Sequence, residues 1–341
     1  MLIASDNGDN SNCSGGKSTL KNRMLLGAFF CFVAAASWGA MFPVAHSAFE
    51  HIDPFYFTLI RYMGVTVILV PLLLWKEGKK AFRLEGRGLH LWFFGTMAFV
   101  VYNLLIFWGE DLLGEPGIMV ASVMEALMPM ISIVIVWVLF RNRPERFTSL
   151  CVIVSFIGAM FVITKGNFTA FLTGVDQIIP SLFIFIAVVG WVIYTMGGDQ
   201  FKGWSVLRYS TLTCLLGTLT ALVVVTGVTL TGYISVPTVE VLQATYPHLL
   251  FMIIFPGLIA LLGWNFGVSI LSPINALLFI NFTPLTTLAV SIFQGYHITV
   301  FDIVGTVFII VALVSNNMYI RIEKHQLSKQ QMSASLRENI S

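Results

Sequence analysis

Long apolar segments separated by short polar ones dominate this chain. A membrane-spanning helix needs about 20 predominantly apolar residues. Ten segments meet this requirement, so we expect ten spans, at residues 24–49, 54–75, 88–109, 116–140, 147–164, 177–197, 204–228, 246–270, 273–294 and 300–319. The connections between them are too short to hold a soluble domain, the longest being 76–87 and 229–245.

Composition agrees with a membrane protein. Of the 341 residues, 57% are hydrophobic and 11% are charged, and the mean hydropathy is +0.86. A soluble domain carries roughly a quarter charged residues. The four cysteines show no CxxC spacing, and GGKST at 15–19 lacks the first glycine and the preceding strand of a phosphate loop. We therefore expect no metal, no cofactor, no nucleic-acid partner and no use of ATP.

The basic residues predict the orientation of the chain. Sixteen of the nineteen Lys and Arg residues fall on one side of the ten spans, and only Lys165 falls on the other. Cytoplasmic loops carry an excess of Lys and Arg. We therefore expect both termini in the cytoplasm and the spans in the cell (plasma) membrane, with residues 1–23 and 321–341 as cytoplasmic tails.

The two halves of the chain carry similar short motifs in the same order, at offsets between 147 and 162 residues. The pairs are SWGAMF (37–42) with GWVIY (190–194), LIRY (59–62) with VLRY (206–209), YN (102–103) with WN (264–265), and LMPMISIVI (127–135) with FTPLTTLAV (282–290). Each unit has five spans, an odd number, so the second unit enters the membrane inverted. Inverted repeats place a binding site near the midplane and provide alternating access. The predicted fold is an all-α polytopic membrane protein of two inverted five-helix repeats.

These motifs resemble those of the ten-span EamA-like branch of the drug/metabolite transporter (DMT) superfamily. The resemblance rests on the WG of Trp38–Gly39, the Arg61 and Arg208 pair, and the Pro129 and Pro284 pair. It covers roughly residues 24–320 and implies a first repeat at 24–166 and a second at 167–320. It also implies export of amino acids or other metabolites, although these motifs do not specify the solute.

Glu125 is the only charged residue in the apolar run 116–140. It lies about 13 Å into that span, close to the midplane of a roughly 30 Å hydrocarbon core. A charged carboxylate there costs about 3 kcal/mol, so the side chain must face protein or water. We expect it to carry a coupling proton or to bind a cationic group of the solute. The alternatives are a structural ion pair with Arg61 and a protonated packing residue.

Two further pairs occupy equivalent places in the repeats. For Arg61 and Arg208 we expect contact with headgroups or capping of a neighbouring helix, with direct solute contact as the alternative. Pro129 and Pro284 each remove a backbone hydrogen bond from a span. They are expected to act either as gating hinges that form a polar site or as fixed kinks.

Aromatic and amide side chains also occur away from the span ends. Interfacial Trp and Tyr cluster at membrane surfaces, so residues inside the spans predict either a cavity wall or tight packing: Trp38, Tyr102, Trp191, Tyr194 and Trp264. Three amides are expected either to join helices by hydrogen bonds or to line the cavity: Asn103, Asn265 and Asn281.

A secondary transporter accounts best for these features. We expect an exporter of small organic metabolites such as amino acids, driven by protons as coupling ion or by the solute gradient, surrounded by lipid and able to form a homodimer. An importer or a facilitative channel is the alternative. An intramembrane enzyme needs a nucleophile with its base, paired acids or a metal motif at membrane depth, and the sequence offers none, so we expect no enzyme.

Overall fold

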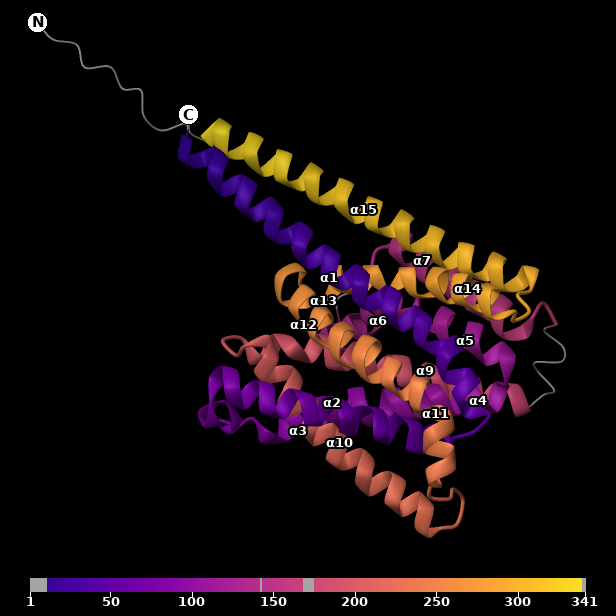
Figure 1. Cartoon of the computed structure of the whole chain (residues 1–341). Helices are drawn as coiled ribbons and strands as arrows, with labels where there is room; N and C mark the ends of the chain where they lie inside the picture. Colours follow the sequence, from indigo (N-terminus) through magenta and orange to yellow (C-terminus); the bar gives the residue numbers. More distant parts are fainter. Residues whose placement is uncertain (1–10, 142, 168–174, 339–341) are drawn as a thin grey trace, which may run out of the picture.

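The spans are helical throughout. The computed structural model describes residues 11–141, 143–167 and 175–338, and every regular element in these ranges is a helix. In these ranges nine helices are long and apolar enough to cross a bilayer, and two shorter helices joined at a 51° bend make a tenth span. The all-α fold class with ten spans is confirmed (Figure 1).

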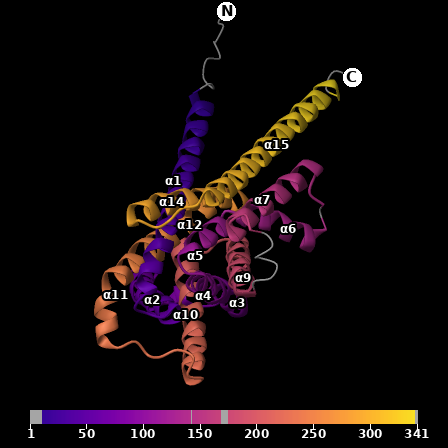
Figure 2. The same ribbon diagram turned by 90° about the vertical axis from the view of Figure 1, so that its right-hand side faces the viewer.

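The elements lie within a few residues of the predicted spans, although several spans are interrupted. They are α1 (Ser11–Phe49), α2 (Pro54–Glu77), α3 (Gly88–Thr96) with α4 (Asn103–Leu113), α5 (Glu115–Glu125) with α6 (Met128–Phe140), α7 (Arg146–Thr164), α9 (Val175–Gly197), α10 (Val206–Leu230), α11 (Val239–Met252) with α12 (Ala260–Leu271), α13 (Pro273–Leu277) with α14 (Phe282–Gln294), and α15 (Val300–Glu338). The ends of α1 and α15 extend into the segments expected as tails and project from the packed body (Figures 1 and 2).

Contacts between the two halves come in equivalent pairs. The first span, α1, packs against α12 and α14, which belong to the eighth and ninth spans. The sixth span, α9, packs against α4 of the third span and makes smaller contacts with α5 and α6 of the fourth. The remaining equivalent spans pack against each other, α2 with α10 and α7 with α15. Exchanging the two repeats therefore reproduces the contact pattern, as inverted units require.

The third span of each repeat contains a π-helical stretch. It covers Met97–Tyr102 in the first repeat and Ile253–Ile259 in the second. Such stretches inside α-helices are rare and occur frequently at functional sites. The YN motif begins at the last residue of the first stretch, whereas the WN motif begins five residues after the end of the second, so the stretches lie in equivalent spans but not at equivalent positions.

The helix geometry of the fourth span of each repeat changes just before its proline. Glu125 ends α5 and Pro129 is the second residue of α6, while Asn281 ends a 3₁₀ turn and Pro284 is the third residue of α14. The first turn of a helix needs no intrahelical partner for its N–H groups, so proline fits there without strain. Pro129 therefore begins a second half-helix after the 51° bend, whereas Pro284 lies just after the point where a 3₁₀ turn passes directly into α14 within one helix, Asn275–Gln294.

The tight packing of α1 against α14 joins the two repeats near Gly39. The hydroxyl of Thr287 donates to the Gly39 carbonyl at 2.8 Å, and the hydroxyl of Thr283 donates to the Ala35 carbonyl at 3.3 Å. A β-carbon at Gly39 would collide with the Thr283 carbonyl oxygen and would lie 2.7 Å from Thr286 Cβ. Only glycine allows this approach.

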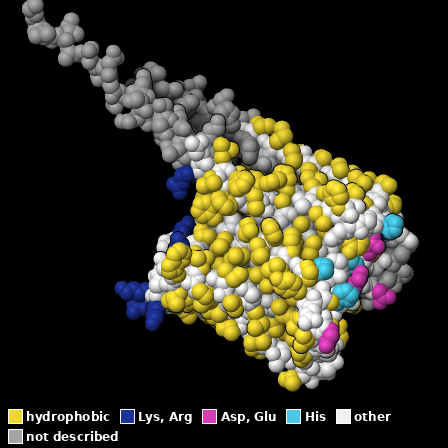
Figure 3. Space-filling model, viewed as in Figure 1, with side chains coloured by type: hydrophobic (Ala, Val, Ile, Leu, Met, Phe, Trp, Pro, Cys, Tyr) yellow, Lys and Arg dark blue, Asp and Glu magenta, His cyan; other side chains and the backbone are white. Residues whose placement is uncertain are grey.

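Charged side chains separate to the two ends of the bundle. Figure 3 shows Lys and Arg at one end, Asp, Glu and His at the other, and hydrophobic side chains between them. We call these ends the basic side, which carries Lys76, Lys79, Lys80, Arg83, Arg87 and Lys202, and the acidic side, which carries Glu50, Asp53, Asp111, Glu115, Asp176 and Glu240. The apolar belt between them fits a lipid environment.

Candidate functional site

Five aromatic rings meet where the repeats join. Trp38 of α1 contacts Trp191 of α9, with ring centroids 5.0 Å apart, and Trp264 of α12, at 5.2 Å. Trp191 also contacts Tyr102 at 4.9 Å and Tyr194 at 5.1 Å. All five side chains are at most 4% exposed. In this structure they pack against one another.

The ring contacts follow the repeat symmetry. Trp38 and Trp191 are equivalent residues of the first and sixth spans, and they meet directly. The contact of Trp38 with Trp264 has its counterpart in that of Trp191 with Tyr102, the residue equivalent to Trp264. The cluster therefore lies on the pseudo-twofold axis, where inverted-repeat transporters place their sites.

The hydrogen bonds in this cluster are not symmetric. Trp38 Nε1 donates to the Pro256 carbonyl at 3.1 Å, inside the π-helical stretch of the eighth span. Trp191 Nε1 is buried and has no hydrogen-bond partner. Buried polar atoms in native structures are nearly always paired. Trp191 therefore offers a free donor at the centre of the cluster.

Glu125 ends α5 at the break in the fourth span and is fully buried. Its Oε1 accepts a hydrogen bond from Tyr102 Oη, and its Oε2 has no partner. The predicted alternative of an ion pair with Arg61 is not formed, because the ion pairs between described residues are Lys165–Asp302 and Arg208–Glu85. Four residues before the equivalent proline, Pro284, the second repeat has Ile280. The carboxylate therefore belongs to one repeat only.

Arg61 lies inside the bundle and does not reach the headgroups. The side chain is 1% exposed, and its Nη1 donates to Asn103 Oδ1 at 3.3 Å. Tyr62 Oη donates to the same oxygen at 3.2 Å, and the Arg61 guanidinium lies 4.7 Å from the Tyr62 ring centroid. Arg61 Nε has no partner. A positive charge and Asn103 thus lie beside Tyr102 and Glu125.

Arg208 has a different environment from its repeat equivalent. It lies in the first turn of α10 on the basic side, where Nη2 donates to the Arg83 carbonyl at 2.5 Å and to Glu85 Oε1 at 2.8 Å. Its guanidinium lies 3.6 Å from the Trp204 ring centroid. Hydrogen bonds from Arg208 and Trp204 lower the pKa of Glu85. Arg208 thus connects the start of α10 to the loop that contains Arg83 and Glu85.

The two remaining amides differ in their surroundings. Asn265 Nδ2 donates to Tyr194 Oη and to Ser210 Oγ, both at 2.8 Å. Asn265 also lines a cleft of about 300 Å³ that includes Lys202 and Trp204 of the basic side. Asn281 donates to the Leu278 carbonyl at 2.8 Å, within its own turn. Asn265 joins helices and reaches a cleft, whereas Asn281 stabilises the break before α14.

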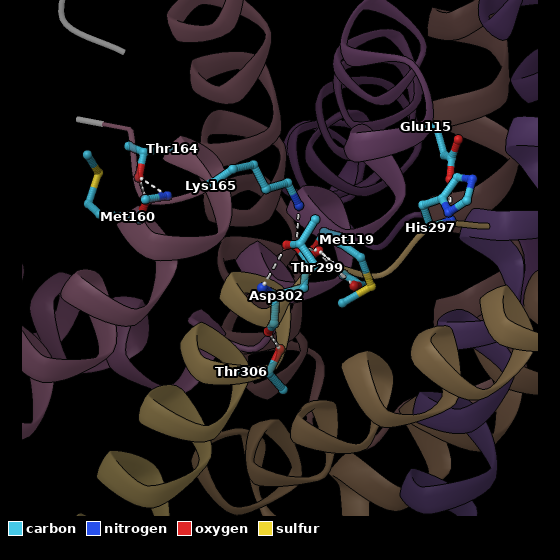
Figure 4. A network of polar contacts seen from close by, with 11 residues as sticks. Glu115, Met119, Met160, Thr164, Lys165, His297, Thr299, Asp302 and Thr306 are labelled. Atoms are coloured by element: carbon cyan, nitrogen blue, oxygen red, sulfur yellow. Dashed lines mark hydrogen bonds and ion pairs between the residues drawn. The ribbon is translucent and has the colours of Figure 1, made fainter. Parts of the chain in front are cut away.

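A polar network lies on the acidic side. Lys165, after α7, pairs with Asp302 in the first turn of α15, and Asp302 also accepts from the Thr299 hydroxyl at 2.7 Å (Figure 4). Glu115 at the start of α5 accepts from the His297 backbone. The sequence predicted Lys165 as an isolated basic residue on this side, and its acidic partner is far away in the chain.

Sequence reasoning missed Glu110. In the sequence it directly follows the predicted span 88–109, next to Asp111, but the structure buries it completely. Both of its carboxylate oxygens lack partners. A signal was present, because Glu110 follows Asn103 by seven residues, which places both on one face of a helix.

The unequal tryptophans allow a matched test of the cluster. Trp38→Phe and Trp191→Phe remove the same atoms at equivalent positions, but only Trp38→Phe breaks a hydrogen bond. We expect Trp38→Phe to be more destabilising than Trp191→Phe, by about 1 kcal/mol. Thermal unfolding of both purified variants in one detergent measures the difference. Equal melting temperatures would contradict the assigned hydrogen bond.

Ten spans in two inverted repeats, enclosing buried charges at their junction, define a multi-pass membrane protein of the transporter class. The model of the EamA-like transporter family matches residues 25–164 and 178–318, so both repeats are covered. The chain belongs to the EamA-like transporter family. The family relationship favours transport over catalysis.

Known relatives agree with this family. The chain is 53% identical over 306 residues to the uncharacterized transporter YrdR of Bacillus subtilis (strain 168), covering 90% of this chain and 95% of that protein. It is 24% identical over 297 residues to the uncharacterized transporter YyaM of the same organism, covering 86% and 93%. A solved crystal structure superposes with a TM-score of 0.61 at 15% identity, covering 88% of this chain and 98% of the other, and supports the fold.

Proposed function

We propose that this protein is a secondary transporter that exports small amino-bearing metabolites, such as amino acids, by alternating access. In this proposal the basic side and both termini face the cytoplasm, and the spans lie in the plasma membrane. The two repeats, residues 24–166 and 167–320, move relative to each other around the aromatic cluster.

One observation carries the proposal: two buried atoms of opposite charge lack partners beside the aromatic cluster. They are Glu125 Oε2 and Arg61 Nε. An amino acid presents an ammonium group to a carboxylate and a carboxylate to a guanidinium, and both are charge-assisted hydrogen bonds. The rings of the cluster provide apolar contact for the rest of the solute. Burial of both charges makes their pairing by a ligand favourable.

The cleft on the basic side supports an access route. It reaches Asn265, which adjoins Trp264 of the aromatic cluster. On the acidic side, the contacts of Lys165 with Asp302 and of Glu115 with His297 hold the spans together. The structure therefore resembles a state closed to the acidic side, in which a solute enters from the basic side.

Glu125 also supplies a mechanism for coupling. Its carboxylate binds the ammonium group of the solute or a proton, but not both at once. A proton that binds after the solute leaves would neutralise the buried charge and favour the return of the empty protein. Export of one solute would then accompany entry of one proton.

Metabolite profiling tests the proposed function. Wild-type protein and an empty vector are expressed in a host that lacks its own amino-acid exporters, and the medium is analysed by mass spectrometry at two external pH values. We expect a small set of amino-bearing metabolites to accumulate with the wild type alone, more strongly at the lower pH. Depletion of such metabolites from the medium would indicate an importer. Accumulation of solutes without an amino group would overturn the assigned solute class.

A further inference from the structure

Glu110 is a buried carboxyl group that no structural contact requires. It is fully buried in α4, and neither oxygen has a hydrogen-bond partner. A carboxylate in such a place costs several kcal/mol unless it is paired or neutralised. A leucine or methionine would fill the same space without that cost. The retained carboxyl group therefore needs an explanation outside packing.

Two glycines hold this turn of α4 between its neighbours. A β-carbon at Gly117 of α5 would collide with the Glu110 carbonyl oxygen. A β-carbon at Gly109 would lie 2.7 Å from the Pro180 carbonyl oxygen of α9. The backbone of Glu110 is thus held directly against α5, the helix that ends at Glu125. A movement of α5 would change the surroundings of both acids together.

Glu110 lies between Glu125 and the acidic side. Asn103 and Glu110 share one face of α4 and are two turns, or about 10 Å, apart. Asn103 lies beside Tyr102, which binds Glu125. Toward the acidic side, burial and the negative charges of Glu50, Glu110 and Glu115 raise the pKa of Tyr296.

Tyr296 lines a cleft on the acidic side. The cleft has a volume of about 220 Å³ and is also lined by Glu115, Ile118 and Met119, next to the Gly117 contact with Glu110. The ring of His46, on α1, lies 5.6 Å from that of Tyr296. Water in this cleft would thus approach Glu110 from the acidic side.

The charged groups that act most directly on Glu110 are acidic. Asp111 and Glu125 act on it electrostatically. Other titratable groups at this end are Glu50 after α1, Asp53 before α2, Glu115 on α5, Asp176 on α9, and His46 and Tyr296. The cleft that Tyr296 lines also contains His297, Asp302 and Lys165, and Lys165 is paired with Asp302. Since the described neighbours include no Lys or Arg paired with Glu110, a proton is the cation best suited to neutralise it.

We propose that Glu110 is a second proton-binding site of the transport cycle, exchanging protons between the acidic side and Glu125. This inference rests on the proposed function, because it requires Glu125 to take up a proton. When α5 and the segment containing Tyr296 move apart, Glu110 takes a proton from water of the acidic side. A proton then passes through intervening water to Glu125, so that Glu125 becomes neutral and Glu110 becomes a carboxylate. The total charge of the pair does not change in this step.

Carbodiimide labelling tests the proposal without knowledge of the solute. Dicyclohexylcarbodiimide is an apolar reagent that adds to protonated carboxyl groups. Purified wild-type protein is treated across a range of pH, and the modified positions are mapped by mass spectrometry. We expect labelling of Glu110 and Glu125 that declines as the pH rises, and we expect Glu125→Gln to shift the pH at which labelling of Glu110 declines. Labelling of Glu125 without labelling of Glu110 would overturn the proposal and leave the role of Glu125 intact.

Proton movement provides the second measurement. Proteoliposomes containing a pH-sensitive dye are supplied with a mixture of amino acids, and dye response is recorded for wild type, Glu110→Gln and Asp111→Asn. Asp111 is the matched control, because it is the adjacent acid and is exposed. We expect Glu110→Gln to lose proton movement and Asp111→Asn to retain it, with both variants folded. A wild-type response in Glu110→Gln would contradict the inference. No proton movement in the wild type would contradict the coupling to which both acids are assigned.

Discussion

Glu125→Gln is expected to reduce solute transport by at least about thirtyfold while leaving the protein folded. Removing one partner of a buried charge pair costs 2–5 kcal/mol, and about 1.4 kcal/mol corresponds to a tenfold change in affinity. Glutamine keeps the acceptor for Tyr102 Oη but removes the charge that binds an ammonium group or a proton. Uptake and efflux in proteoliposomes, normalised to protein content, measure the effect.

Two controls make this prediction specific. Glu125→Asp keeps the charge and is expected to retain part of the activity, with an altered dependence on pH. Glu85→Gln removes an exposed acid of the basic side and is expected to transport as the wild type does. Wild-type transport by a folded Glu125→Gln variant would assign Glu125 a packing role.

Gly39→Ala is expected to be strongly destabilising. The added β-carbon would press on the Thr283 carbonyl oxygen and separate α1 from α14. Overpacking of this kind costs about 1–3 kcal/mol, and loss of the Thr287 hydrogen bond to the Gly39 carbonyl adds about 1 kcal/mol. Because this contact joins the repeats, we expect loss of monodisperse protein in size-exclusion chromatography and a lower melting temperature.

Gly227→Ala is the matched control for that substitution. Gly227 is also a helical glycine, but an added β-carbon meets nothing within 4 Å. Alanine favours a helix over glycine by roughly 0.5–1 kcal/mol, so this variant is expected to be as stable as the wild type or slightly more so. Equal losses in the two variants would mean that helix flexibility, and not the contact of α1 with α14, explains the result.

The sequence was sufficient to predict the ten spans and to show which spans of the two repeats are equivalent. Runs of about 20 apolar residues need no tertiary information to be recognised, because each span must satisfy its own backbone. The RY, YN and WN motifs and the two prolines revealed the repeat, since equivalent positions meet equivalent neighbours. The symmetry of the repeats is consistent with the contact between Trp38 and Trp191, but the distance between the two rings could not be predicted from the sequence.

Other features depend on neighbours that are distant in the chain. Glu110 directly follows the third predicted span, and its burial depends on the close approach of Gly117 from α5, which is a tertiary effect. Arg61 and Arg208 occur in the same short motif but at different distances from the start of their helices. Arg61 lies two turns into α2, and Arg208 lies in the first turn of α10. The π-helical stretches have no strong local sequence pattern. The roles of these residues in transport stay predictions.

Glu125 in the first repeat and Ile280 in the second occupy equivalent positions, and this difference implies different roles for the two repeats. If both repeats carried the carboxylate, each half would recognise the solute, and substitutions in either half would change what is bound. Under the proposed function, recognition would be concentrated in the first half, where Glu125 lies with Arg61 and Tyr102. The second half contributes rings and an apolar surface at the equivalent place. Solute preference can therefore evolve through the first repeat, while the second keeps the shape that closes over whatever is bound.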